Sequence, residues 1–153
     1  IAVALSGQAL HFERQGDRHT LQPSWQPKWY VSYSGKRGVT LECVKKVKAL
    51  FEKNASLAAQ LDQSMKEAVL KSEQALSLPQ DQGFSILCEA IQKAAYCFEA
   101  WGLVEGAPSQ HISMLKQAGA SAVKPTGSGD GGYVLSLWKE EPPIELQKTL
   151  IPC

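Results

Sequence analysis

Residues 118–138 read AGASAVKPTGSGDGGYVLSLW, and this stretch decides the fold. Two apolar runs, residues 120–123 and 133–138, flank a loop that has four glycines in the six residues 127–132. The second run begins with Tyr, Val and Leu, which suit strands, and the glycines predict a connection back to the first run. Glycine lets other groups approach the backbone, so the amide groups of such a loop can converge on an anion.

Two common phosphate motifs do not fit this loop. Gly127, Gly129 and Gly132 satisfy the pattern GxGxxG, but a dinucleotide site needs a helix after the glycines, and a strand pattern follows here. No Gly-Lys-Ser/Thr ends the stretch, which excludes a P-loop. On glycine content alone, a plain hairpin turn stays open.

The same residues resemble the third motif of the galactokinase, homoserine kinase, mevalonate kinase and phosphomevalonate kinase (GHMP kinase) superfamily. That motif typically reads AGAxGAKxTGAGGGG. The shared features are the AGA at residues 118–120, Lys124 three residues before the first loop glycine, and the TGxGxGG core. Asp130 departs from the pattern, because most members have glycine there. A carboxylate in a phosphate cradle is unfavourable unless it points away or faces Mg²⁺.

The resemblance implies a phosphate- and substrate-binding loop, whose amides and two hydroxyls would flank the transferred phosphoryl group and the acceptor. Its residues are Thr126, Gly127, Ser128, Gly129, Asp130, Gly131 and Gly132. We expect the glycine geometry to matter most for phosphoryl transfer. Because the loop is predicted to be exposed, we expect valine at position 131 to lower stability only modestly, and Asp130→Gly to be tolerated.

Residues 1–12 resemble the superfamily segment SGxDxAVxxxGGxxxF just after its functional Asp. We therefore expect that Asp to precede Ile1, and no catalytic residue within this chain. By the same resemblance, ATP and Mg²⁺ bind mainly to an N-terminal kinase domain that these residues do not contain. The chain alone is predicted to be inactive.

Composition bounds the function. With 153 residues, 44% of them hydrophobic and 20% charged, the chain is long enough for a real core. A net charge of +1 without a Lys/Arg stripe argues against nucleic-acid binding, and no apolar run is long enough to cross a membrane. The four cysteines form no CxxC and suggest reduced thiols of a cytoplasmic protein, and the three histidines show no metal spacing.

The order of patterns predicts an α+β fold in which helices cover one face of an antiparallel sheet. Strands are expected near residues 1–5, 8–14, 18–21, 28–34, 120–124 and 133–138, and helices near 41–53, 57–76, 84–101, 109–118 and 144–150. Thr40 and Ser109 are predicted helix caps, and Asn54 a left-handed helix end. The resemblance divides the chain into residues 1–22, the last strands of an N-terminal domain, and 23–153, a ferredoxin-like C-terminal domain.

Within the superfamily, the Gly131-Gly132-Tyr133 run and the turn at residues 34–40 look most like mevalonate kinases. The implied function is ATP-dependent phosphorylation of a small alcohol in isoprenoid precursor synthesis, with the chain's own N-terminal domain as partner and a homodimer left open. Other acceptors (phosphomevalonate, homoserine, a sugar) also stay open. The alternative is a non-catalytic ferredoxin-like domain that binds a ligand or dimerises.

Overall fold

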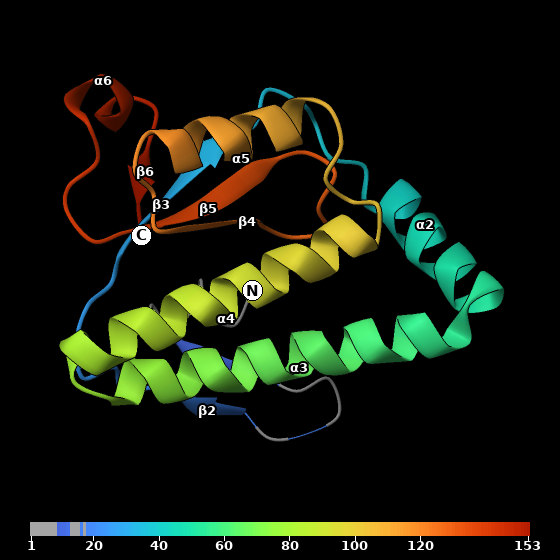
Figure 1. Cartoon of the computed structure of the whole chain (residues 1–153), viewed down its shortest axis with the longest axis horizontal. Coiled ribbons are helices and arrows are strands. Elements are labelled where there is room, and N and C mark those ends of the chain that lie inside the picture. The colour runs from blue at the N-terminus through green and yellow to red at the C-terminus, as the bar shows by residue number, and fades with distance from the viewer. Residues whose placement is uncertain (1–8, 13–15, 17) are drawn as a thin grey trace.

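The structure is a computed structural model that describes residues 9–12, 16 and 18–153. Helices and an antiparallel sheet pack together, which confirms the α+β class (Figure 1). The strands are β1 (Leu10–Phe12), β2 (Arg18–Thr20), β3 (Lys28–Tyr33), β4 (Ala122–Pro125), β5 (Tyr133–Trp138) and β6 (Ile151–Pro152). The helices are α2 (Thr40–Lys53), α3 (Ala55–Ser77), α4 (Gln80–Ala100), α5 (Ala107–Gln117) and α6 (Ile144–Gln147). The apolar run at residues 1–5, predicted as a strand, lies outside the described residues.

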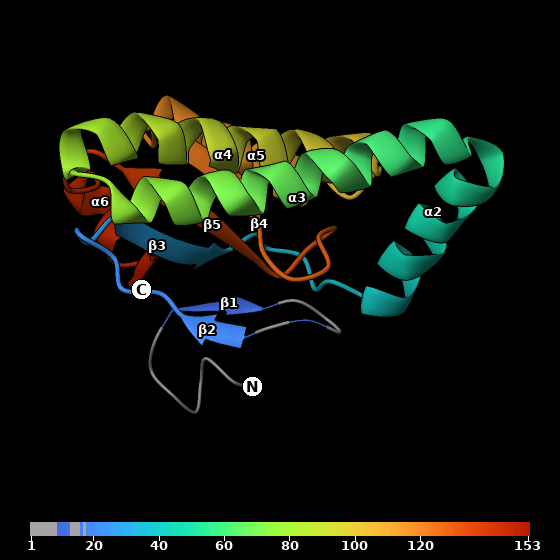
Figure 2. The same cartoon turned by 90° about the horizontal axis from the view of Figure 1, so that it is seen from below.

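The main sheet has four antiparallel strands in the order β4-β5-β3-β6. β5 lies between β4 and β3, and it pairs with β3 over its full length, from Tyr133 opposite Tyr33 to Trp138 opposite Lys28. The sequence around the glycine loop therefore forms one edge and the centre of this sheet. β1 and β2 form a separate two-stranded sheet, which is set off from the main one (Figure 2).

Helices cover both faces of the main sheet, so the prediction of a single covered face is wrong. Ala122 and Leu137 lie opposite each other and pack with residues of α3 and α4 such as Leu87 and Ile91. The next residue along each strand points to the other face, where Val123 packs with side chains of α5. Figure 1 shows the strands between α4 and α5. Strand residues on both faces of the sheet are apolar, and each face packs against helices.

Three predicted helix caps differ from the structure. α2 begins after Val39, whose side chain makes no capping bond, and Thr40 is its first residue. Asn54 is not left-handed (φ −149°); its Oδ1 accepts a bond from the amide of Leu57 at 3.1 Å and caps α3. A single residue separates α2 from α3, so the end of one helix is also the start of the next. α5 begins after Gly106 (φ 63°), which places Ser109 inside the helix.

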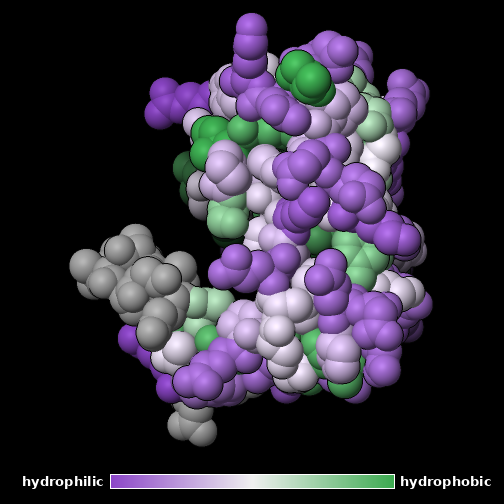
Figure 3. Space-filling view, turned by 90° about the vertical axis from the view of Figure 1, so that its left-hand side faces the viewer, coloured by the Kyte–Doolittle hydropathy of each residue, from purple (hydrophilic) through white to green (hydrophobic). Residues whose placement is uncertain are grey.

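Among the described residues, no helix combines the length and the apolar character needed to cross a bilayer. The side shown in Figure 3 is largely hydrophilic, with hydrophobic side chains in small separate groups.

Candidate functional site

The loop of residues 126–132 is the connection between β4 and β5. The strands pair up to Pro125 and Val134, and Thr126 then donates both its amide (3.0 Å) and its hydroxyl (2.8 Å) to the carbonyl of Tyr133. The hairpin interpretation is thus correct as topology. The hydroxyl of Thr126 donates its hydrogen to the backbone, whereas the resemblance implied that this hydroxyl faces a ligand.

Most of the loop has a left-handed backbone. Gly127, Gly129, Gly131 and Gly132 have φ between 59° and 138°, and Asp130 has φ 50°. Asp130 is the one non-glycine residue with positive φ among the described residues. Aspartate is one of the few residues that tolerate this conformation, so the family's glycine can be replaced here at small conformational cost.

The hydrogen bonds of the loop amides separate structural groups from free ones. Four amides have protein acceptors: Thr126 to Tyr133 O, Gly129 to Thr126 O, Asp130 to Leu103 O, and Gly132 to Lys36 O. Within the described part of the chain, the amides of Gly127, Ser128 and Gly131 have none. Backbone N–H groups need a partner, so these three are the loop donors that a bound anion can use. All three amides lie within the predicted binding residues 126–132.

The N-terminus of α2 lies next to the tip of the loop. The hydroxyls of Thr40 and Ser128 are 3.3 Å apart, and the thiol of Cys43 donates to the carbonyl of Gly129 at 3.5 Å. No side chain caps α2, and the amides of Thr40 and Leu41 have no acceptor among the described residues. An uncapped helix start carries partial positive charge, so it adds to the positive potential beside the loop amides.

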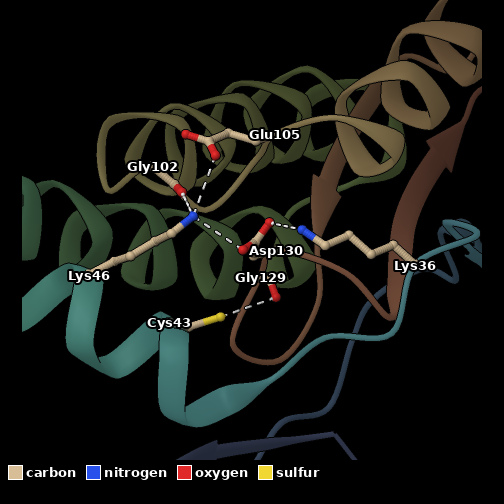
Figure 4. A network of polar contacts seen from close by, with 7 residues as sticks. All are labelled: Lys36, Cys43, Lys46, Gly102, Glu105, Gly129 and Asp130. Carbon is tan, nitrogen blue, oxygen red and sulfur yellow. Dashed lines mark hydrogen bonds and ion pairs between the residues drawn. The ribbon is translucent and has the colours of Figure 1, made fainter.

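Asp130 is held between two lysines (Figure 4). Its two carboxylate oxygens accept bonds from Lys36 Nζ at 2.7 Å and Lys46 Nζ at 3.2 Å. Burial raises the pKa of the Asp130 carboxyl, but the hydrogen bonds and positive charges of both lysines outweigh burial and place the pKa below its ordinary value. The Asp130 charge is therefore neutralised inside the protein. Asp130 ties the loop to the turn before α2 and to α2 itself.

Part of the loop is packed against neighbouring segments, so Gly129 and Gly131 are not exposed as expected. A Cβ on Gly129 would lie 2.9 Å from Cβ of Leu103, and one on Gly131 would lie 2.8 Å from the carbonyl oxygen of Lys36. Both glycines are buried. The prediction that valine at 131 changes stability only modestly is thus wrong, because a side chain there would separate the two loops. Gly127 and Gly132 have open space instead.

Lys124 lines the same cleft as Gly127 and Ser128, although it was not among the predicted binding residues. Its amine donates to the carbonyl of Pro125 at 3.0 Å and lies 5.6 Å from the ring centroid of Phe98. Burial lowers the pKa of this amine, and it makes no ion pair within the described part of the chain. A lysine without a carboxylate partner beside free amides suits a phosphate. The sequence did contain a signal for this residue, because Lys124 lies three residues before the first loop glycine, as the lysine of the GHMP kinase motif does.

A largely apolar cleft of about 740 Å³ borders the loop. It is lined by Cys43, Val44, Val47, Lys48, Phe51, Met65, Phe98, Trp101, Leu103, Lys124, Gly127 and Ser128. Met65 and Trp101 pack with the buried cluster of Cys43, Phe98 and Leu103, and they also form part of the wall of this cleft. The arrangement offers apolar surface for a ligand body and cations and amides for an anionic end.

The three histidines lie in two places. His111 is a satisfied interior residue: Ser32 Oγ lies 2.7 Å from its Nε2, and burial lowers its pKa. His11 and His19 lie together beside Glu73, away from the loop. Sequence spacing missed this pair, because a hairpin brings together residues eight positions apart.

Comparisons with known proteins identify the fold. No family model matches the sequence, and no curated protein matches it significantly. Among solved structures, L. major mevalonate kinase in complex with R-mevalonate has a TM-score of 0.76 at 16% identity, covering 92% of this chain and 43% of that chain. The chain has the fold of part of a mevalonate kinase.

Two other solved structures agree. Mevalonate kinase from methicillin-resistant Staphylococcus aureus MRSA252 has a TM-score of 0.61 at 22% identity, covering 90% of this chain and 41% of that one. Streptococcus pneumoniae phosphomevalonate kinase in complex with phosphomevalonate and AMPPNP has a TM-score of 0.64 at 18% identity, covering 87% and 37%. These structures confirm, at the level of fold, the resemblance to GHMP kinases. This chain spans less than half the length of each of these proteins.

Proposed function

We propose that this chain is the loop-bearing part of an ATP-dependent kinase that phosphorylates a small alcohol. The observation that carries the proposal is the group of three unpartnered loop amides, Gly127, Ser128 and Gly131, in a loop whose tip meets the uncapped N-terminus of α2. Both features favour a phosphate group. The kinase fold of similar solved structures supports the same reading.

Phosphoryl transfer depends mainly on positioning the phosphates and stabilising their charge. In the proposed site, the loop amides donate hydrogen bonds to phosphoryl oxygens. Lys124 adds a positive charge at the cleft that Gly127 and Ser128 also line. The hydroxyls of Thr40 and Ser128 lie 3.3 Å from each other, and in this proposal they orient the anion. The sheet and the ion pairs of Asp130 with Lys36 and Lys46 hold these donors in place, so the donors need little rearrangement during transfer.

The residues present fit the phosphates of ATP better than they fit Mg²⁺. The loop amides and Lys124 supply donors for phosphate oxygens. Asp130, the one carboxylate in the loop, has both oxygens engaged by lysines, so it does not fit a Mg²⁺ ligand in this arrangement. We therefore place no metal ligand in residues 126–132. The Asp130 carboxylate would become available to a metal ion on nucleotide binding only if Lys36 and Lys46 both moved away from it.

Mevalonate is the acceptor that we propose. Support comes from the similarity of the loop and the turn at residues 34–40 to mevalonate kinases, and the four free thiols support a cytosolic setting. The test is a panel of mevalonate, phosphomevalonate, homoserine and galactose with ATP and Mg²⁺, assayed on the protein in its full encoded length. Turnover on mevalonate alone is expected, and this chain by itself is expected to be inactive. Transfer only to another acceptor would keep the kinase and reject the substrate.

A non-catalytic ligand-binding domain is the second candidate. The apolar cleft of about 740 Å³ with Lys48 and Lys124 at its wall favours it, because such a cleft suits an amphipathic anion without any chemistry. Binding of a nucleotide or phosphorylated alcohol without transfer, in the full-length protein with the whole panel, would support this candidate against the kinase.

A further inference from the structure

A second cluster of chemistry-bearing side chains lies where the β1–β2 hairpin meets α3. His11 and His19 are directly paired across the two strands, so their side chains leave the hairpin on one face. The rings stack with centroids 4.8 Å apart and planes 7° from parallel. Glu73 of α3 meets both: its carboxylate oxygens lie 2.8 Å from His11 Nδ1 and 2.9 Å from His19 Nε2.

We propose that His11, His19 and Glu73 form a binding site for a divalent transition-metal ion of the Zn²⁺ class, with the fourth position open to water. Two imidazole nitrogens and one carboxylate oxygen make a donor set that zinc accepts, and three protein ligands plus a water is a common arrangement for an accessible zinc ion. The sequence predicted no metal site. The proposal does not depend on the kinase activity.

The distances suit such an ion. The three candidate ligand atoms all lie within 4.8 Å of one another. Zn²⁺ binds nitrogen and oxygen at about 2.0–2.2 Å, so ligand atoms around a tetrahedral ion are roughly 3.3–3.5 Å apart. The short distance from the ligating carboxylate oxygen to its bonded ring nitrogen has to lengthen, and the widest distance has to shorten by about 1.5 Å at most. Side-chain rotation can supply this, since the His19 and Glu73 side chains are 53% and 30% exposed.

A simple ion-pair cluster is the competing explanation. In that arrangement, each imidazole donates one N–H to Glu73, and the two rings stack with their centroids 4.8 Å apart. One divalent ion would bind both nitrogens and the carboxylate at the same time. The cluster also has room for an ion to enter, because His11 lines a cleft of about 460 Å³, and His19 and Glu73 line another of about 240 Å³.

The ion would fasten the hairpin to the helix. A two-stranded sheet is marginally stable alone, and β1–β2 is not part of the main sheet. His11 and His19 come from the hairpin, and Glu73 lies on α3, more than fifty residues further along the chain. A metal that binds all three closes this long loop and stabilises the folded chain by mass action.

The test uses untagged chain, stripped of metal with a chelator and then titrated with Zn²⁺ by calorimetry. One equivalent is expected to bind and to raise the melting temperature. Co²⁺ should give the intense visible absorption of a four-coordinate site without sulfur-to-metal charge transfer, which separates this cluster from the cysteines. In histidine-selective NMR spectra, the ring signals of His11 and His19 should shift on addition of Zn²⁺, and those of His111 should not.

Matched variants assign the ligands. Glu73→Gln keeps the shape of the side chain, and His19→Ala removes one ring; each is expected to weaken binding by more than about ten-fold. Glu67→Gln on the same helix and Cys153→Ser should bind as the unmodified chain does. Should His19→Ala fail to fold, Glu73→Gln and the NMR shifts still decide. Absence of binding, binding unchanged by Glu73→Gln, or binding lost in Cys153→Ser would overturn the proposal and leave an ion-pair cluster.

Discussion

Gly131 lies against Gly38 so closely that a Cβ on Gly131 would be 2.7 Å from the amide nitrogen of Gly38. Conversely, a Cβ on Gly38 would lie 3.3 Å from the carbonyl oxygen of Gly129. The turn before α2 and the loop after β4 therefore meet backbone to backbone at these glycines, and the amide of Gly132 donates to Lys36 O across the same contact at 2.7 Å. This contact sets the position of the loop relative to α2.

The first prediction compares alanine at two loop glycines. Gly127→Ala meets open space and costs only the strain of a left-handed backbone, about 1–2 kcal/mol. Gly131→Ala adds a clash with the backbone of residues 36–38, so we expect a total loss of about 2–5 kcal/mol. Urea denaturation of both variants measures the difference in the free energy of unfolding. Equal losses would show that the loop is not docked on the turn.

A second prediction concerns Asp130→Asn. An amide oxygen can still accept from one lysine, but its NH₂ cannot accept from the other, so part of the clamp is lost. We expect a loss of about 1–2 kcal/mol near neutral pH, at the low end for charged hydrogen bonds because Lys36 and Lys46 are about 40% exposed. Urea midpoints of the two chains measure it.

The same pair of chains has a defined pH dependence. The pKa of Asp130 is lowered in the folded chain relative to its ordinary value of 3.8. The carboxylate therefore contributes its full stability above 3.8, and this contribution is lost as the pH falls through the lower, folded-state pKa. The stability difference from Asp130→Asn should be constant at higher pH and shrink below about 4. A difference that does not change with pH would contradict the ion-pair account.

How much the sequence revealed depended on whether a feature is local. Strand and helix patterns placed every main element, and the run AGASAVKPTGSGDGG identified both the loop and the fold, because glycine spacing and apolar periodicity act over a few residues. The role of Asp130 was beyond reach, since Lys36 and Lys46 approach it from 94 and 84 residues away. Asn54 misled because two helices share one boundary residue. The covering of both sheet faces followed from where α5 packs, which no local pattern encodes.

The third prediction is a pattern of thiol labelling. All four cysteines are free; Cys153 is exposed, and Cys43 and Cys97 are buried. Burial raises the pKa of the Cys97 and Cys88 thiols, so little reactive thiolate forms at neutral pH. Labelling of the native chain should modify Cys153 first, and denaturant without reductant should expose four thiols. Mass spectrometry of the labelled peptides checks both, and fewer than four thiols in denaturant would contradict the proposal of a reducing, cytosolic setting.

The fourth prediction tests Lys124 as the cation of the phosphate site. In the protein at full encoded length, Lys124→Met should lower phosphoryl transfer by about 10²–10³-fold, the usual effect of removing a donor at developing negative charge. Its stability at neutral pH should not fall, because the variant removes a desolvated charge that has no carboxylate partner within the described residues. Lys45→Met is the matched control: its exposed pair with Glu42 contributes little, and turnover should stay unchanged.

Alkaline stability gives this prediction an independent readout. The pKa of Lys124 in the folded chain lies below the ordinary 10.5, so the unfolded chain holds the proton more tightly between the two values. Stability from this residue therefore rises as the pH increases through that window, and Lys124→Met should lose the rise. Urea midpoints of the two chains over alkaline pH measure it. Normal turnover in Lys124→Met would remove the lysine from the proposed site, whereas a lost alkaline rise with normal turnover would leave it a buried structural amine.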